Sequence, residues 1–119
     1  MTLAQPVSFQ TLIDRLKDVP FDELRKQYEG YFEFVMQTRH LPQLYPILES
    51  YFGPPFKPAG IDPSAPANDI AGRYGGIQKQ QTLYYLKRDG LSSCAMIWPW
   101  SSGSRVTVKL AQGIAGEKA

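Results

Sequence analysis

The spacing of hydrophobic residues changes along this chain from a helical period to a period of two. In the segment that follows Ser8, "FQTLIDRLKDV", apolar residues recur at helical spacing, and Ser8 is a favourable N-cap. Pro20 comes next, and proline lacks the backbone donor that a continuing helix needs. The sequence therefore predicts a short helix whose buried stripe is formed by Phe9, Leu12, Ile13, Leu16 and Val19.

The segment 21–39, "FDELRKQYEGYFEFVMQTR", predicts a second helix. Two acidic residues lie in its first turn, where they are favourable at the positive end of a helix. Phe32 and Phe34 fall off the helical stripe, so we expect this helix to be covered on two sides. The stripe itself consists of Leu24, Tyr28, Tyr31 and Val35, with Met36 at its border.

A third helix is predicted over 40–53, "HLPQLYPILESYFG", with Gly53 as its C-cap. Pro46 leaves two alternatives open, a kinked helix and a helix that begins only at this proline. Residues 53–76 contain five prolines and five glycines, which excludes regular structure for most of their length. Hydrophobic residues within this stretch supply anchors, so we expect 54–76 to be an ordered loop that wraps the surface.

Three strands are predicted from residue 77 onward. "IQKQQTLYYLK" and "LSSCAMIWPW" alternate with period two and are joined by Asp89 and Gly90, which can adopt positive φ. The third strand, "RVTVKLA", follows a predicted three-residue turn at 101–103. These strands form an antiparallel meander.

The two turns fix the register of the meander. In the first hairpin Gln81 pairs with Trp98, and in the second hairpin Trp98 pairs with Val106. Both hairpins then place their apolar residues on one face, which we expect the helices to cover. This predicted core face carries Leu83, Tyr85, Cys94, Met96, Trp98, Val106, Val108 and Leu110.

The opposite face of the predicted meander is less polar than a solvated sheet face should be. Tyr84, Leu86 and Ile97 lie on it in this register, so something is expected to cover them. The candidates are the loop 54–76, a second copy of the chain, another protein or a ligand. We therefore predict a partner-binding site formed by Tyr84, Leu86, Ile97 and Trp100.

The predicted fold class is α+β, with a group of two to three N-terminal helices packed on a C-terminal three-stranded antiparallel meander. A chain of 119 residues is the length of one domain. We expect the single domain 1–119 to consist of a helical part 8–53, the loop 54–76, the meander 77–111 and a frayed tail 112–119.

Composition and charge exclude some classes of protein. Hydrophobic residues make up 43% of the chain and charged residues 20%, as in globular rather than disordered proteins. No signal peptide or membrane span is recognisable, so we expect a soluble cytoplasmic protein. Residues 1–52 hold five basic and seven acidic side chains, a net charge of −2, whereas 53–119 hold eight and four, a net charge of +4.

Few side chains suggest chemistry. Cys94 and His40 are the only pair that resembles a nucleophile and its base, but the predicted register buries Cys94 in mid-strand as a small hydrophobic residue. We predict His40 to lie at the end of the second helix, where a cation is favourable. One cysteine and one histidine form no zinc motif. The sequence therefore predicts no catalytic residues, no metal and no cofactor.

These observations favour a protein-interaction or self-assembly module, with a homodimer as one form of assembly. It would use the second face of the sheet and the loop 54–76. One alternative is the binding of single-stranded nucleic acid by aromatic and basic residues of the sheet, with Lys79, Lys87, Arg105 and Lys109 as the cations. Another alternative is a small ligand, or a small enzyme, with a pocket between helices and sheet lined by Tyr28, Tyr31 and Trp98.

Overall fold

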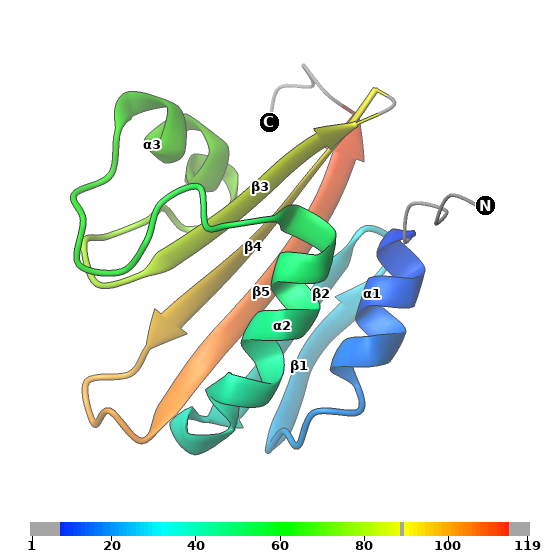
Figure 1. Cartoon of the computed structure of the whole chain (residues 1–119), viewed down its shortest axis with the longest axis vertical. Helices are drawn as coiled ribbons and strands as arrows, with labels where there is room; N and C mark the ends of the chain where they lie inside the picture. The colour runs from blue at the N-terminus through cyan, green and yellow to red at the C-terminus, as the bar shows by residue number, and fades with distance from the viewer. Residues whose placement is uncertain (1–7, 89, 115–119) are drawn as a thin grey trace, which may run out of the picture.

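The chain forms one five-stranded antiparallel sheet with helices on both faces (Figure 1). The structure is a computed structural model and describes residues 8–88 and 90–114. Its elements in chain order are α1 (Phe9–Leu16), β1 (Glu23–Tyr28), β2 (Tyr31–Gln37), η1 (Thr38–His40), α2 (Leu41–Phe52), α3 (Ala65–Ala71), η2 (Gly72–Tyr74), β3 (Thr82–Arg88), β4 (Leu91–Pro99) and β5 (Arg105–Ile114). The strand order is β1-β2-β5-β4-β3. The fold class is therefore α+β, as predicted, but helices and strands are interleaved along the chain.

The first helix confirms its sequence signals. The Ser8 hydroxyl oxygen accepts a hydrogen bond from the backbone N–H of Thr11, which satisfies one of the donors that a helix start leaves unpaired. All five residues of the predicted stripe are buried. α1 thus packs on the sheet through the face that its spacing predicts.

The predicted helix over 21–39 is wrong, because this segment is a β-hairpin formed by β1 and β2. Gly30 has a φ of 78° in the turn, and its carbonyl accepts a hydrogen bond from the N–H of Gln112. A Cβ at Gly30 would lie 2.9 Å from the Gln112 carbonyl oxygen, so this turn requires glycine. The many apolar residues of this segment suggested a helix that is covered on two sides. They belong instead to β2, a strand whose two faces are both buried.

The third predicted helix is confirmed as α2, which runs through Pro46 and ends at Gly53 with a φ of 79°. The loop 54–76 is ordered, but it contains a helix that the proline and glycine content concealed. α3 begins at the N-cap Ser64, whose hydroxyl oxygen accepts a hydrogen bond from the N–H of Ala67. Prolines in a first turn are compatible with a helix, and Pro66 occupies such a position.

The hairpin of β3 and β4 has the predicted register, with Leu83 opposite Met96. Gly90 has the predicted positive φ, whereas Asp89 lies outside the described residues. Gln81 precedes β3, so its predicted pairing with Trp98 does not form. β5 continues to Ile114, so the predicted tail 112–119 begins within a strand, and residues 115–119 lie outside the description.

The register of the second hairpin was predicted wrongly by one residue. Trp98 lies opposite Thr107 rather than Val106, because Trp100 pairs with Arg105 and four residues, not three, form the loop between them. A shift of one residue moves every side chain of β5 to the other face of the sheet. The apolar residues of the meander are therefore divided between two faces.

Two cores result, one on each face of the sheet. In Figure 1, α1 and α2 lie in front of the sheet, and the residues beneath them form the α1–α2 face. Its strand residues are Phe32, Phe34, Met36, Tyr84, Leu86, Ala95, Ile97, Val106, Val108 and Leu110. The opposite α3 face packs against α3 and η2 through Tyr31, Leu83, Tyr85, Cys94, Met96, Trp98 and Ala111.

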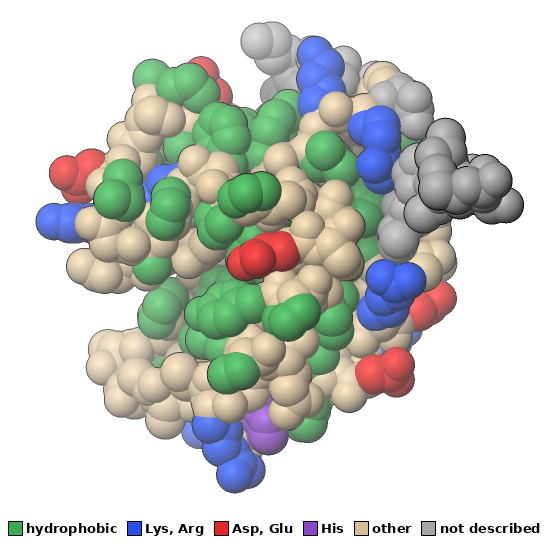
Figure 2. All heavy atoms as spheres, in the orientation of Figure 1, with side chains coloured by type: hydrophobic (Ala, Val, Ile, Leu, Met, Phe, Trp, Pro, Cys, Tyr) green, Lys and Arg blue, Asp and Glu red, His purple; other side chains and the backbone are tan. Residues whose placement is uncertain are grey.

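This arrangement corrects the predicted partner-binding site. Tyr84 and Ile97 are buried, and Leu86 packs against the same core, because α1 and α2 cover that face. On the side of the molecule shown in Figure 2, hydrophobic side chains gather over α2 and beside the loop that follows it. Because the helices of the chain itself cover Tyr84, Leu86 and Ile97, no partner is needed to cover them.

Lys57 closes one edge of the sheet. Its backbone exchanges two hydrogen bonds with Leu83 on the outer side of β3, at 3.0 and 2.9 Å. Its ammonium, buried with the residue 3% exposed, donates to the carbonyls of Pro58, Lys79 and Gln81. Burial lowers the pKa of Lys57, whereas three acceptors favour the ammonium, which supplies three donors. This side chain ties the loop after α2 to β3.

Replacing Lys57 by Met should lower the free energy of unfolding by about 2–4 kcal/mol, because buried carbonyls lose their charged donor. Urea denaturation measures this change. Lys79→Met is the matched control, since Lys79 is exposed, and it should change stability by less than about 0.5 kcal/mol. Equal stabilities for the two variants would contradict the role given to Lys57.

Candidate functional site

The open edge of the sheet is the most exposed regular element of the fold. We define the β1 edge as Phe21, Asp22 and the strand β1. All six residues of β1 are exposed, and in residues 8–88 and 90–114 no strand lies on its outer side. Leu24 and Tyr28 are 45% and 63% exposed, which is unusual for large apolar side chains in a strand. The β1 edge therefore offers both backbone groups and apolar surface.

A bulge shapes the middle of this edge. Glu23 and Leu24 pair with Val35 and Phe34, but the register shifts before Lys26, so Arg25 is the extra residue of β1. Bulges and cations are devices with which proteins keep open edges from pairing indiscriminately. The β1 edge carries both of these devices.

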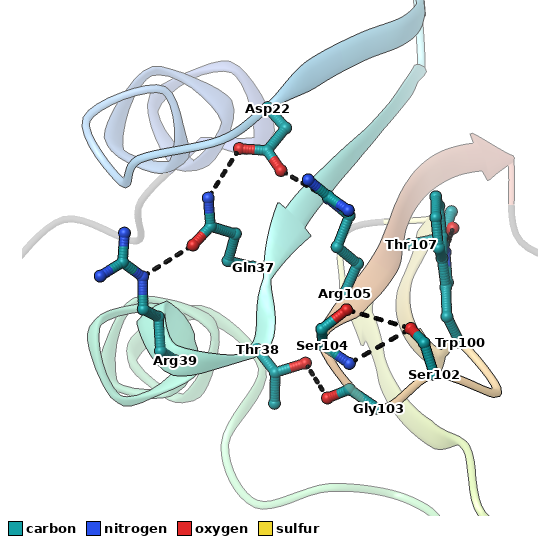
Figure 3. Close-up of polar contacts among 10 residues, drawn as sticks. All are labelled: Asp22, Gln37, Thr38, Arg39, Trp100, Ser102, Gly103, Ser104, Arg105 and Thr107. Atoms are coloured by element: carbon teal, nitrogen blue, oxygen red, sulfur yellow. Dashed lines mark hydrogen bonds and ion pairs between the residues drawn. The ribbon is translucent and has the colours of Figure 1, made fainter.

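A polar network anchors the start of the β1 edge to the neighbouring strands (Figure 3). Asp22 accepts hydrogen bonds from Arg105 on β5 at 2.7 Å and from Gln37 on β2 at 3.3 Å. These contacts, with Arg105 first, lower the pKa of the Asp22 carboxyl from its ordinary value. Thr38 donates to the Gly103 carbonyl, which joins the same end of β2 to the loop between β4 and β5.

Aromatic side chains connect the edge to the α3 side of the molecule. Tyr28 stacks on Tyr31 with ring centroids 5.2 Å apart, and Tyr31 stacks on Tyr74 at 6.2 Å. The Tyr31 hydroxyl donates to Glu33 at 2.6 Å. Burial and the Glu33 carboxylate raise the pKa of Tyr31. These stacked rings pack the C-terminal end of β1 against the α3 side of the sheet.

The two tryptophans have different roles. Trp98 lies in the α3 core, with the Lys109 ammonium 3.5 Å from its ring centroid, whereas Trp100 is 36% exposed. The Trp100 indole N–H donates to the Thr107 hydroxyl at 2.9 Å, and the guanidinium of Arg25 lies over its ring. Of the four residues predicted to bind a partner, Trp100 alone lies on an exposed surface, and it adjoins the β1 edge.

The four cations predicted for nucleic-acid binding are not brought together with Tyr84. Arg105 is paired with Asp22, and Lys109 donates to the Tyr74 carbonyl at 3.0 Å. Burial lowers the pKa of Lys109, and the Glu33 carboxylate opposes that shift. The side chains of Lys79 and Lys87 are exposed, but Tyr84 is buried on the opposite face.

A pocket of about 190 Å³ lies between α3 and the sheet. It is not the predicted pocket lined by Tyr28, Tyr31 and Trp98. The residues that line it are Asp69, Ile70, Arg73, Tyr74, Tyr85, Ser92, Ser93, Cys94 and Ala111. Its volume is below the ~300 Å³ at which pockets for drug-sized ligands begin. A larger open hollow, of about 400 Å³, lies between α1 and the turn of the β1–β2 hairpin and is lined by Phe9, Gln10, Ile13, Gln27, Tyr28, Glu29, Gly30 and Gln112.

Cys94 and His40 do not form a catalytic pair. Cys94 lies opposite Ala111 on β5, whereas His40 follows the end of β2, where Gln37 lies opposite Arg105. Arg105 and Ala111 are six residue steps apart on β5, which corresponds to about 20 Å of strand. His40 was predicted at the end of a helix and instead lies at the N-cap of α2. Burial raises the pKa of the Cys94 thiol to about 12.

Sequence reasoning missed the β1 edge because it assigned these residues to a helix. The signal that could have found it is the turn Glu29–Gly30 between two tyrosines, followed by the apolar run of β2. No protein-family model, no curated protein and no solved structure matches this chain. None of the helices in the described part of the chain is long and apolar enough to cross a membrane.

Gly75→Ala should destabilise the protein more than Gly76→Ala. Both glycines have positive φ, so each variant is expected to lose about 1–2 kcal/mol from backbone strain. A Cβ at Gly75 would also lie 2.5 Å from the Trp98 ring, whereas at Gly76 it would meet nothing within 4 Å. We expect an additional loss of about 1–3 kcal/mol at Gly75, measured by urea denaturation. Equal losses would contradict this packing of Trp98.

The thiol of Cys94 should be unreactive in the folded protein. At pH 8 it is both buried and protonated, so we expect a chromogenic disulfide reagent to label it at least ~100-fold more slowly than in 8 M urea. The rate of colour formation measures this difference. Rapid labelling without denaturant would show that Cys94 is accessible and would contradict the packing of the α3 face.

Proposed function

We propose that this protein is an interaction module that associates with another polypeptide through the β1 edge. The proposal keeps the class of function that the sequence favours and changes the surface. Binding would add a strand to the sheet, so that backbone hydrogen bonds supply affinity and side chains supply specificity. A catalytic role receives no comparable support, because the buried thiol of Cys94 is protonated and lies far from His40.

The difference between the two edges of the sheet carries this proposal. The outer side of β3 is occupied, because Lys57 exchanges two backbone hydrogen bonds with Leu83 and its side chain fixes the loop there. The outer side of β1 has no such cover in the described chain. An edge that is left open while the opposite one is closed is available for strand addition.

Apolar side chains on both flanks of the β1 edge support the same conclusion. Phe21 and Leu24 lie on the flank of the α1–α2 face, where Phe21 packs against Phe34. Tyr28 and Trp100 lie on the other flank, and all four flanking side chains are at least 36% exposed. Aromatic residues of this kind are enriched in protein interfaces.

The sequence also favoured the loop 54–76 as a partner contact, but that contact is not part of this proposal. The loop residues Phe56 and Ile61 are exposed at 45% and 55%, but they lie in the segment that closes the opposite edge of the sheet. Binding of nucleic acid or of a small ligand stays a prediction. The pairing of Arg105 with Asp22 makes the nucleic-acid alternative weaker.

Removing apolar surface from the β1 edge should abolish association. We expect the double variant Leu24→Asp/Tyr28→Ser to be monomeric and free of partners under conditions in which the original protein associates. Both side chains are exposed, so the free energy of unfolding should change by less than about 1 kcal/mol. Native mass spectrometry of protein purified gently from its own cells reports both self-association and bound partners.

Ile61→Ser is the matched control, because Ile61 is more exposed than Leu24 but lies in the loop. This variant should associate like the original protein. Two outcomes would contradict the proposal: association that survives in the double variant, and an original protein that neither self-associates nor carries a partner at any concentration tested.

A further inference from the structure

Along the β1 edge, acidic residues come first and basic residues follow. Asp22 and Glu23 are acidic, Arg25 and Lys26 are basic, and the exposed Leu24 separates the two pairs. We propose that the partner of this edge is a second copy of the chain, whose β1 strand pairs antiparallel about a two-fold axis at Leu24. This inference rests on the proposed function and specifies its partner.

Antiparallel self-pairing makes the edge complementary to itself. Around an axis at Leu24, Glu23 of one chain lies opposite Arg25 of the partner subunit, and Arg25 lies opposite the partner's Glu23. Side chains directly opposite in an antiparallel pair are about 5 Å apart, and opposite charges there are favourable. The same patch then serves both chains, which is the condition for a closed two-fold dimer.

Four other alignments of two β1 strands set like charges against each other. An axis at Arg25 or at Lys26 places that cation beside its own copy in the partner subunit. An axis between these two residues places Arg25 opposite the partner's Lys26 at both ends. A parallel pair in register sets Glu23 beside the partner's Glu23. Like charges directly opposite each other are destabilising, so the charge pattern selects the alignment centred on Leu24 over these.

Leu24 supplies the apolar centre of this contact. It is 45% exposed in the single chain and lies on the axis, where it meets the partner's Leu24. Arg25 is held in place by its contact with the Trp100 ring and by a 3.6 Å ion pair with Glu23 of its own chain. The two sheets become continuous through the paired edges. A short strand pair is a small interface, so the dimer is expected to be weak, with a dissociation constant on the order of micromolar.

Charge exchange between two variants tests this inference. In Glu23→Arg the dimer would contain two Arg–Arg contacts, and in Arg25→Glu two Glu–Glu contacts, so each variant alone should dimerise at least tenfold more weakly. An equimolar mixture restores both opposite pairs and should form a heterodimer with the affinity of the original homodimer. Sedimentation equilibrium over ~1–500 μM measures the dissociation constants, and native mass spectrometry identifies the heterodimer.

The mixture separates contacts between chains from contacts within one chain. Each variant disrupts its own Glu23–Arg25 pair, and mixing cannot repair that pair. Recovery of the dimer therefore reports the interchain contact alone. Asp69→Arg in α3 and Lys87→Glu in β3 are controls with the same changes in net charge at exposed positions away from the β1 edge, and they should dimerise like the original protein.

Three results would overturn the inference. A mixture that stays as weak as its components excludes the alignment at Leu24. Unchanged dimerisation of Arg25→Glu shows that another contact holds the dimer. An original protein that is monomeric at every concentration excludes self-pairing. If that monomer carries a different protein that Leu24→Asp/Tyr28→Ser releases, the proposed function stands and only this inference fails.

Discussion

The pairing of β4 with β5 is the constraint on which the rest of this structure depends. These two strands lie at the centre of the sheet, and their register decides which side chains of β5 face α1 and α2. Val108 lies opposite Ile97 on that face, while Lys109 lies on the other face above Trp98. Because side chains alternate along a strand, one register sets both cores at once. The loop between Trp100 and Arg105 fixes that register through its length.

The pairing of β4 with β5 also determines which strands form the two edges of the sheet. β2 adds to one side of it and carries β1 outward, whereas β3 adds to the other side and meets the loop after α2. The ammonium of Lys57 then stabilises that loop as a cover for β3. No described segment does this for β1, so its charged and apolar side chains face solvent. The two edges of the sheet therefore differ in how they are covered, and the proposed function rests on this difference.

Local signals predicted local structure well. The N-cap at Ser8, the C-cap at Gly53 and the first hairpin of the meander are confirmed, because each depends on residues close together in sequence. The helix over 21–39 was wrong because β2 is apolar on both faces, and such a run lacks the period of a half-buried strand. The loop between β4 and β5 is one residue longer than predicted, so every side chain of β5 was assigned to the wrong face. The partner surface was therefore predicted on a face that is buried. Order within the loop 54–76 was foreseen, but α3 was hidden by prolines that a first turn accepts.

We propose that the β1 edge gains a strand when the protein associates. Amide hydrogen exchange, followed residue by residue by NMR at ~10 μM and ~1 mM, tests it most directly, because a backbone N–H exchanges slowly only when it is hydrogen-bonded. We expect protection to increase with concentration within β1, while amides of β3 keep the same protection at both concentrations. Protection of β1 that does not depend on concentration would contradict self-pairing at this edge.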